Sequence, residues 1–131
     1  MSPLRLLAYA WAFPTTMLGL LFVPESLLSG QVRWVDQALE VHGRWARFFL
    51  SRCTLLPEGA SAMTLGHVIL CRDSALPQAT RIHEHVHVRQ CERWGPLFIP
   101  AYLSISALLW LRGREWYDEN PFEREAFGKT E

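Results

Sequence analysis

The stretch PQATRIHEHVHVRQCERWGP, residues 77–96, decides most of what this sequence indicates. His83 and His87 are four positions apart, so on a helix both imidazoles lie on one face and can bind the same Zn²⁺ ion. Glu84 stands beside them, where a carboxylate can act as general base toward a metal-bound water whose pKa the ion lowers to about 7. This HExxH arrangement predicts a catalytic zinc centre, provided that the stretch is helical.

The alternation of histidine and valine over residues 83–88 also fits the two-residue period of a strand. A strand would place three imidazoles on one face, which describes another type of zinc site. The flanks favour a helix: Pro77 suits a first turn, Thr80 is an alternative cap, and Gly95–Pro96 is a strong stop. Roughly 16 residues lie between these signals, more than a usual strand contains. We therefore predict a helix over residues 78–94.

Neither His85 nor Cys91 joins the predicted site. His85 lies about 200° around the helix from His83 and points away from it. Cys91 continues the face of His83, but roughly 12 Å of helix rise separates the two residues, too far for one ion to bind both. Chance also produces a bare HExxH, in about one of every few hundred chains of this length. The alternative is therefore a His-rich helix without a metal, and the surrounding sequence must decide.

A catalytic zinc site needs a third protein ligand. The extended metzincin pattern does not supply it, because its glycine and third histidine would fall at Gln90 and Arg93. Downstream, Asn120 as N-cap and Pro121 at the first helical position predict another helix that carries carboxylates. Without a metal, these acids fit an ordinary helix start, since Asn120 and Glu123 have capping-box spacing and acids suit the helix dipole. With a helical HExxH upstream, we interpret this helix as the source of the third ligand.

An HExxH motif followed some tens of residues later by a helix with Glu-x-x-Ala resembles the gluzincin class of zinc metallopeptidases, above all its smallest and membrane-linked members. The resemblance covers about residues 80–126 and implies zinc-dependent hydrolysis of a peptide or protein substrate. In the membrane-linked gluzincins the ligand is the glutamate three positions before the alanine, which here is Glu123 before Ala126, with Glu125 as the alternative. The family pattern continues with an aspartate that orients a ligand histidine, where this chain has Phe127.

The segment Ser61–Cys71 is bounded by Pro57–Gly59 and Arg72–Ser74 and is expected to form one strand or a hairpin, with a bulge or tight turn at Gly66. Zincin sites resemble this order, because an edge strand beside the active helix pairs with the backbone of an extended substrate. His67 is more typical of a satisfied polar residue than of a fourth ligand, and we keep it only as a contact to substrate or metal-bound water. The spacing does not select an oxyanion donor among Tyr102, Tyr117 and Arg89.

The composition describes one domain of 131 residues, half of them hydrophobic. Thirteen basic and thirteen acidic residues give a formal net charge of zero, and the sequence has no nucleic-acid module or glycine-rich phosphate loop, so a nucleic-acid partner is not expected. Three cysteines in no ligand or redox spacing fit a reduced compartment better than a disulfide scaffold; they are Cys53, Cys71 and Cys91.

Two apolar segments, Leu6–Val23 and Leu97–Leu111, carry no charged residue and raise the question of a membrane. Both are short for a span of about 20 apolar residues, and both contain proline or polar interruptions. The metal ligands on either side of Leu97–Leu111 must share one side of any membrane, so this segment is expected to pack on the motif helix or lie along the bilayer surface. Leu6–Val23 remains open as an uncleaved anchor or a core helix. Because Arg5 precedes it and four arginines follow within residues 33–52, an anchor would leave the site on the cytoplasmic face.

Residues 31–52 read as an amphipathic helix, with Val35, Leu39, Val41 and Trp45 near helical spacing. Overall we predict an α+β, mainly α fold: a minimal zincin-like helical domain with a short strand or hairpin before the HExxH helix. The chain 1–131 is expected to be a single domain, with a hydrophobic N-terminal helix in residues 1–28 as a candidate membrane anchor and a catalytic part in residues 29–131.

The predicted activity is zinc-dependent peptide hydrolysis, with His83, His87 and Glu123 as ligands and Glu84 as general base. We expect the protein to be membrane-associated with its site facing the cytoplasm, or cytoplasmic. Two alternatives stay open. The same residues fit a catalytically silent zinc-binding protein, and a coincidental HExxH fits a small membrane-associated structural protein.

Overall fold

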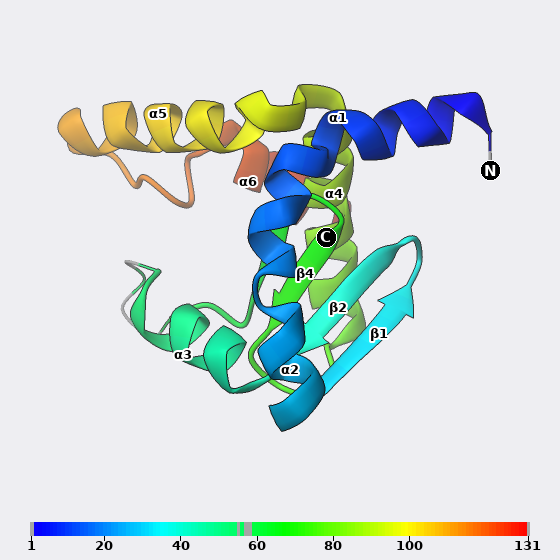
Figure 1. The fold of residues 1–131 in the computed structure, drawn as a ribbon. Coiled ribbons are helices and arrows are strands. Elements are labelled where there is room, and N and C mark those ends of the chain that lie inside the picture. Colours follow the sequence, from blue (N-terminus) through cyan, green and yellow to red (C-terminus); the bar gives the residue numbers. More distant parts are fainter. Residues whose placement is uncertain (1, 55, 57–58, 131) are drawn as a thin grey trace.

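The computed structural model describes residues 2–54, 56 and 59–130 (Figure 1), and the predicted boundary at Pro57–Glu58 lies outside these residues. Helices dominate over a small four-stranded mixed sheet, so the chain has the α+β, mainly α fold that the sequence predicts. In chain order the elements are α1 (Pro3–Leu20), α2 (Val23–Ser29), β1 (Gln31–Val35), β2 (Ala38–His42), α3 (Arg44–Arg52), β3 (Ala62–Leu65), β4 (Val68–Cys71), α4 (Gln78–Trp94), the 3-10 turn η1 (Gly95–Leu97), α5 (Phe98–Leu111) and α6 (Pro121–Thr130).

The sheet has the strand order β1-β2-β4-β3. β1 pairs with β2 and β3 pairs with β4 in antiparallel hairpins, whereas β2 and β4 are parallel, with Leu39 opposite Val68. The central strand β4 reads Val-Ile-Leu-Cys and is buried at every position, as expected for a strand that is covered on both faces. β3 is left as an edge strand.

Helices cover both faces of the sheet (Figure 1). On one face Ile69 packs with Val88 of α4, and on the other Leu70 packs with Leu50 of α3. α1 lies on this second face, where its Gly19 comes so close to β4 that an added Cβ would lie 2.5 Å from the Cβ of Val68. The core of the protein is therefore the sheet held between α4 and the helices α1 and α3.

The prediction of a helix over residues 78–94 is confirmed by α4, which spans Gln78–Trp94. The helix ends at Gly95, which has a φ of +57° and therefore adopts a conformation that other residues rarely take. An added Cβ at this glycine would also meet the ring of Trp11, whose Nε1 donates to the carbonyl of Arg93. The stop signal in the sequence is thus also the point where α1 crosses the end of α4.

Residues 61–71, expected to form one strand or a hairpin, form the hairpin β3–β4, with Gly66 in its turn at a φ of +65°. The predicted helix over residues 31–52 is wrong for its first part, which forms the hairpin β1–β2. Asp36 and Gln37 both adopt positive φ in its two-residue turn, and such a turn matches the twist of paired strands. Only residues 44–52 are helical, as α3.

By length and composition alone, the continuous helical stretch Gln78–Leu111 is long and apolar enough to cross a membrane. The pair Pro3–Leu20 and Val23–Ser29, bent by 47°, passes the same test as a broken span. Such a result is weak, because core helices of soluble proteins also pass it. It is consistent with membrane association and with a soluble protein.

Candidate metal centre

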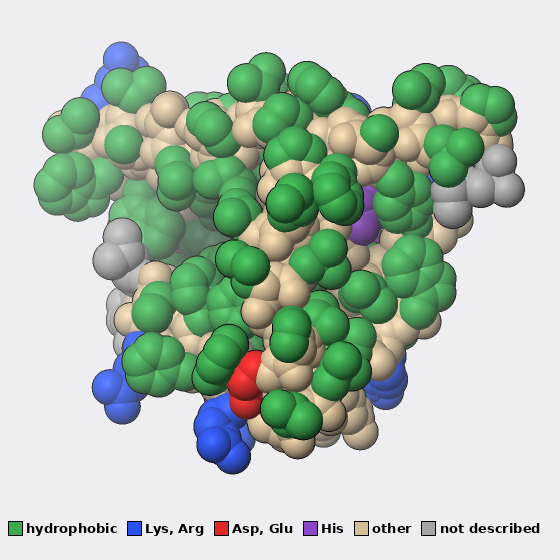
Figure 2. All heavy atoms as spheres, in the orientation of Figure 1, with side chains coloured by type: hydrophobic (Ala, Val, Ile, Leu, Met, Phe, Trp, Pro, Cys, Tyr) green, Lys and Arg blue, Asp and Glu red, His purple; other side chains and the backbone are tan. Residues whose placement is uncertain are grey.

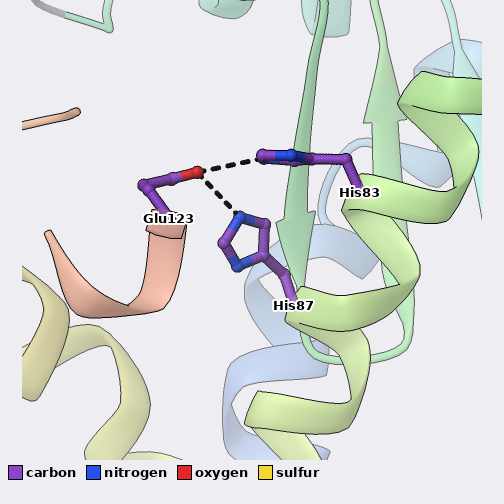
Figure 3. Close-up of side chains that lie close together, drawn as sticks. All are labelled: His83, His87 and Glu123. Atoms are coloured by element: carbon purple, nitrogen blue, oxygen red, sulfur yellow. Dashed lines mark hydrogen bonds and ion pairs between the residues drawn. The ribbon is translucent and has the colours of Figure 1, made fainter. Parts of the chain in front are cut away.

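Three side chains predicted to bind metal converge between α4 and α6 (Figure 3). The Oε1 atom of Glu123 lies 3.0 Å from Nε2 of His83 and 3.1 Å from Nε2 of His87. All three side chains are buried, and their candidate ligand atoms lie within 4.8 Å of one another. Two histidines one helical turn apart and a carboxylate from a second helix are thus placed so that they could hold one metal ion.

α6 begins as the sequence predicts. The Oδ1 atom of Asn120 accepts a hydrogen bond from the backbone N–H of Phe122 over 2.9 Å, and its Nδ2 donates to Ser106 Oγ of α5 over 2.8 Å. The cap therefore ties the start of α6 to α5 and fixes the position of Glu123 in its first turn. The carboxylate of Glu123 is directed at the histidines of α4.

Gln90 supports the site although the sequence analysis assigned it no role there. His87 Nδ1 lies 2.7 Å from Gln90 Oε1, which fixes this nitrogen as a donor and leaves Nε2 directed at Glu123. The Nε2 atom of Gln90 donates to the carbonyl of Phe122 over 3.0 Å and to Glu125 over 2.6 Å. The only sequence signal was local, since Gln90 stands three positions after His87 on the same helix.

Glu125, the alternative third ligand, is not brought to the histidines. Its carboxylate accepts from Gln90 and lies 3.2 Å from Arg93 in an exposed ion pair. Phe127 occupies the position at which the gluzincin pattern has an aspartate, and its ring lies 4.5 Å from that of His83. An aromatic contact thus restrains His83 where the family pattern would supply a carboxylate.

Glu84 is buried beside the histidines and lines the same cavity as His87. The hydroxyl of Thr64, on the edge strand β3, lies 2.8 Å from Glu84 Oε1, so the hairpin orients the carboxylate. Burial raises the pKa of Glu84, although the charges of His87 and His83 act in the opposite direction. A carboxylate whose pKa is raised toward neutrality is a stronger general base than an exposed one.

His87 and Glu123 hold each other in their charged forms. Burial alone would lower the pKa of His87, but the hydrogen bond and the charge of Glu123 outweigh it and raise this pKa to about 9. Burial alone would raise the pKa of Glu123, but hydrogen bonds from both histidines lower it to about 2. The carboxylate therefore occupies the position between the imidazoles that a cation would take, and metal binding must displace the proton.

These shifts predict how the stability of the metal-free protein depends on pH. His87 stabilises the fold fully below its ordinary pKa of 6.5, and this contribution is lost as the pH rises through about 9. Glu123 stabilises it above its ordinary 4.5, and this is lost as the pH falls through about 2. With a chelator present, the free energy of unfolding should fall by on the order of a few kcal/mol between pH 6.5 and 9. Thermal unfolding checks this, and stability that is flat over that range would contradict the pairing.

Two tyrosines complete the site. The hydroxyl of Tyr102, on α5, donates to Glu123 Oε2. Tyr117 lines the same cavity, and burial raises the pKa of both phenols, so both remain hydrogen-bond donors at neutral pH. The structure thus brings two of the three suggested oxyanion donors to the site. The third, Arg89, lines a different hollow together with His85.

A cavity of about 400 Å³ lies against the metal centre. Glu84, His87 and Glu123 form its polar end, and nearly all of the remaining surface is apolar. The wall is built by α3, β3, α5 and the segment before α6, and it includes Phe49, Met63, Leu65, Phe98, Ile99, Leu103 and Trp116.

The remaining predicted contact, His67, lies elsewhere. Its ring stacks on Tyr9, and its Nε2 lies 2.7 Å from Glu92, which also binds Arg5 of α1. Glu92 is nine positions after His83, so it faces the opposite side of α4. The structure therefore does not bring His67 to the metal centre.

In the part of the chain that the structure describes, one group of three histidine, cysteine or acidic side chains is close enough to hold a metal ion, and it is His83, His87 and Glu123. The geometry, burial and donor set of this group suit a divalent metal ion with an affinity for imidazole and carboxylate. No protein-family model, curated protein or solved structure matches this chain.

Proposed function

We propose that this protein is a zinc-dependent metallopeptidase of the gluzincin type. The observation that carries the proposal is the buried group His83, His87 and Glu123 at the end of a cavity, with Glu84 beside it. A closed structural zinc site has four protein ligands, whereas three ligands next to a cavity leave a position for water and substrate. A zinc ion bound there would supply an acidic water and polarise the carbonyl of the scissile bond.

Glu84 has the role of general base. Its carboxylate takes a proton from the attacking water while the water oxygen bonds to the carbonyl carbon, and it passes this proton to the amide nitrogen as the C–N bond breaks. The products are a carboxylate and an amine. Thr64 holds Glu84 in place for both transfers, and protonated Tyr117 supplies a hydrogen bond to the oxygen that gains negative charge, since the hydroxyl of Tyr102 is donated to Glu123.

The apolar cavity favours substrates with a large apolar side chain next to the scissile bond. Peptides with Leu or Phe at that position should be cleaved at least tenfold faster, by kcat/KM, than peptides with Asp or Lys, because a charged side chain would lose its hydration without gaining a partner. Initial rates on a matched series of quenched fluorescent peptides measure the preference. Equal rates for Leu and Asp peptides would contradict the use of this cavity.

Cleavage of unstructured peptides by the zinc-loaded protein tests the function itself. We expect cleavage that a zinc chelator abolishes and that added zinc restores. Zinc-loaded protein without cleavage of any peptide would instead support the catalytically silent zinc-binding protein.

We further propose that the protein works at a membrane with its site on the cytoplasmic side. The exposed apolar side chains of α1 and α5 support a membrane location, and three free cysteines fit a reducing compartment such as the cytoplasm.

A further inference from the structure

α1 has its large apolar side chains outside and its small ones inside. The small residues Ala12, Thr15, Thr16 and Gly19 are buried against the sheet and α4, whereas the exposed side includes Leu7, Phe13, Met17 and Leu18. A surface helix of a soluble protein has the opposite distribution, with its apolar stripe facing the core. Small residues at the packed face and large apolar residues on the outer face are typical of helices in lipid.

α5 also has an apolar outer side. Within it only Phe98 and Ser106 are buried, and Leu108 and Leu111, one turn apart, are exposed. Residues 95–111 contain no charged side chain at all. An uncharged helix with large apolar residues exposed along its length marks an interaction surface rather than a solvated one.

The two helices form one surface, which we call the α1/α5 face. α5 and the first turns of α1 run along the same side of the molecule and point in opposite directions from the end of α4 (Figure 1). Hydrophobic side chains cover α1 and α5 in Figure 2, and the charged side chains lie mainly at the margins of that view. Residues 6–23 and 94–111 carry no charged side chain, and at their ends Arg5 pairs with Glu92 and Arg93 with Glu125. An uncharged surface of this kind matches the hydrocarbon of a bilayer rather than water.

The geometry excludes a span by either helix. α5 has 14 residues, about 21 Å of helix, against the roughly 30 Å of a hydrocarbon core. α1 is longer, but it is attached to the domain at both ends: Arg5 binds Glu92, and Thr16 Oγ1 accepts from the backbone N–H of His67 over 3.0 Å. Neither helix can therefore cross a bilayer without giving up the contacts that hold it.

We propose that the α1/α5 face inserts into one leaflet of a membrane, so that the protein is monotopic. Apolar outer stripes enter the upper part of the hydrocarbon, and the flanking arginines lie at headgroup level. Ile99 and Leu103 place α5 over the metal cavity as part of its wall. The cavity then lies directly under an inserted helix. If the protein is the proposed peptidase, its substrates are therefore peptide segments at the membrane surface.

Flotation of the full-length protein with vesicles of phosphatidylcholine, with and without phosphatidylglycerol, tests the insertion. The wild type should float with both kinds of vesicle, because burial of the apolar face drives the insertion. Leu7→Glu/Leu108→Glu should reduce the lipid-bound to free ratio at least tenfold, because each change removes a leucine from the apolar surface. The matched control is Leu28→Glu, a change of a residue that is 90% exposed on α2, outside the face, and it should bind as the wild type does.

Zinc content is measured on the same samples, so that loss of lipid binding is distinguished from loss of the metal centre. Zinc should be equal in the wild type and both variants. A wild type that stays in solution beside vesicles overturns the proposal, as does equal loss of binding in the Leu28→Glu control. A lipid-free dimer that Leu7→Glu/Leu108→Glu converts to a monomer, without flotation of the wild type, would make the face an interface between copies and would also overturn it.

Cysteine labelling in sealed vesicles separates insertion from spanning. Cys53 is exposed, whereas burial raises the pKa of the thiols of Cys71 and Cys91 to about 12 and makes them unreactive. The Ser2→Cys variant is added to the outside of preformed, sealed vesicles and is then treated with a maleimide that cannot cross the bilayer. This reagent should label both position 2 and Cys53. Protection of only one of these two positions would show that α1 crosses the bilayer and would overturn the proposal.

Discussion

Glu84→Gln should reduce kcat for peptide cleavage by about 10²–10⁴-fold, the range that a positioned general base contributes. Zinc should be retained, because Glu84 is not one of the three convergent ligands. The amide of glutamine is the same size and its oxygen can still accept from Thr64, so the site should keep its shape. The variant therefore removes the proton acceptor and little else.

The matched control for this change is Thr64→Val, which keeps the volume of the side chain but removes the hydroxyl that orients Glu84. It should lower kcat by about tenfold and leave KM nearly unchanged, since an orienting contact matters less than the base itself. A Glu84→Gln protein that loads zinc and cleaves peptides at the wild-type rate would show that the assigned base is wrong.

Glu123→Ala should weaken zinc binding more than about 100-fold. Loss of a residue that only hydrogen-bonds to a metal ligand typically weakens binding by about 10–100-fold, and here a ligand itself is lost. The change removes one of three ligands and leaves His83 and His87 alone on α4. Competition against a chromophoric chelator measures the affinity directly.

Glu125→Ala provides the control for the third ligand, because the two glutamates are two positions apart on α6 but face different partners. Glu125 binds Gln90 and Arg93, so its loss should weaken zinc binding by no more than about tenfold, through weaker support of His87. If Glu125→Ala lost the metal and Glu123→Ala kept it, the assignment of the third ligand would have to be reversed.

The sequence predicts the parts of the site that depend on local spacing. The one-turn separation of His83 and His87 and the cap at Asn120 are set within one helix each, so they can be read without the fold. The parts that depend on packing could not be found in this way. Thr64 reaches Glu84 only because the edge strand β3 lies along α4, and Tyr102 reaches Glu123 only because α5 is tied to the start of α6.

The difference between local spacing and packing also explains why the prediction of a helix over residues 31–42 was wrong. Val35, Leu39 and Val41 also fit a helical stripe, but β2 gains its place by pairing with β4, about thirty residues further along the chain. Such pairing leaves no local signal apart from the Asp36–Gln37 turn. Likewise, hydropathy shows that the segment Leu6–Val23 is apolar, but only the fold shows that its small residues face inward.

Metal content of the purified protein, measured by elemental mass spectrometry, tests the central claim most directly. The wild type should contain close to one zinc ion per chain, and His83→Ala/His87→Ala should contain none, because the two imidazoles supply two of the three ligands. Absence of zinc from the wild type, even after reconstitution with the metal, would contradict the account. The HExxH sequence would then be a coincidence in a small membrane-associated protein.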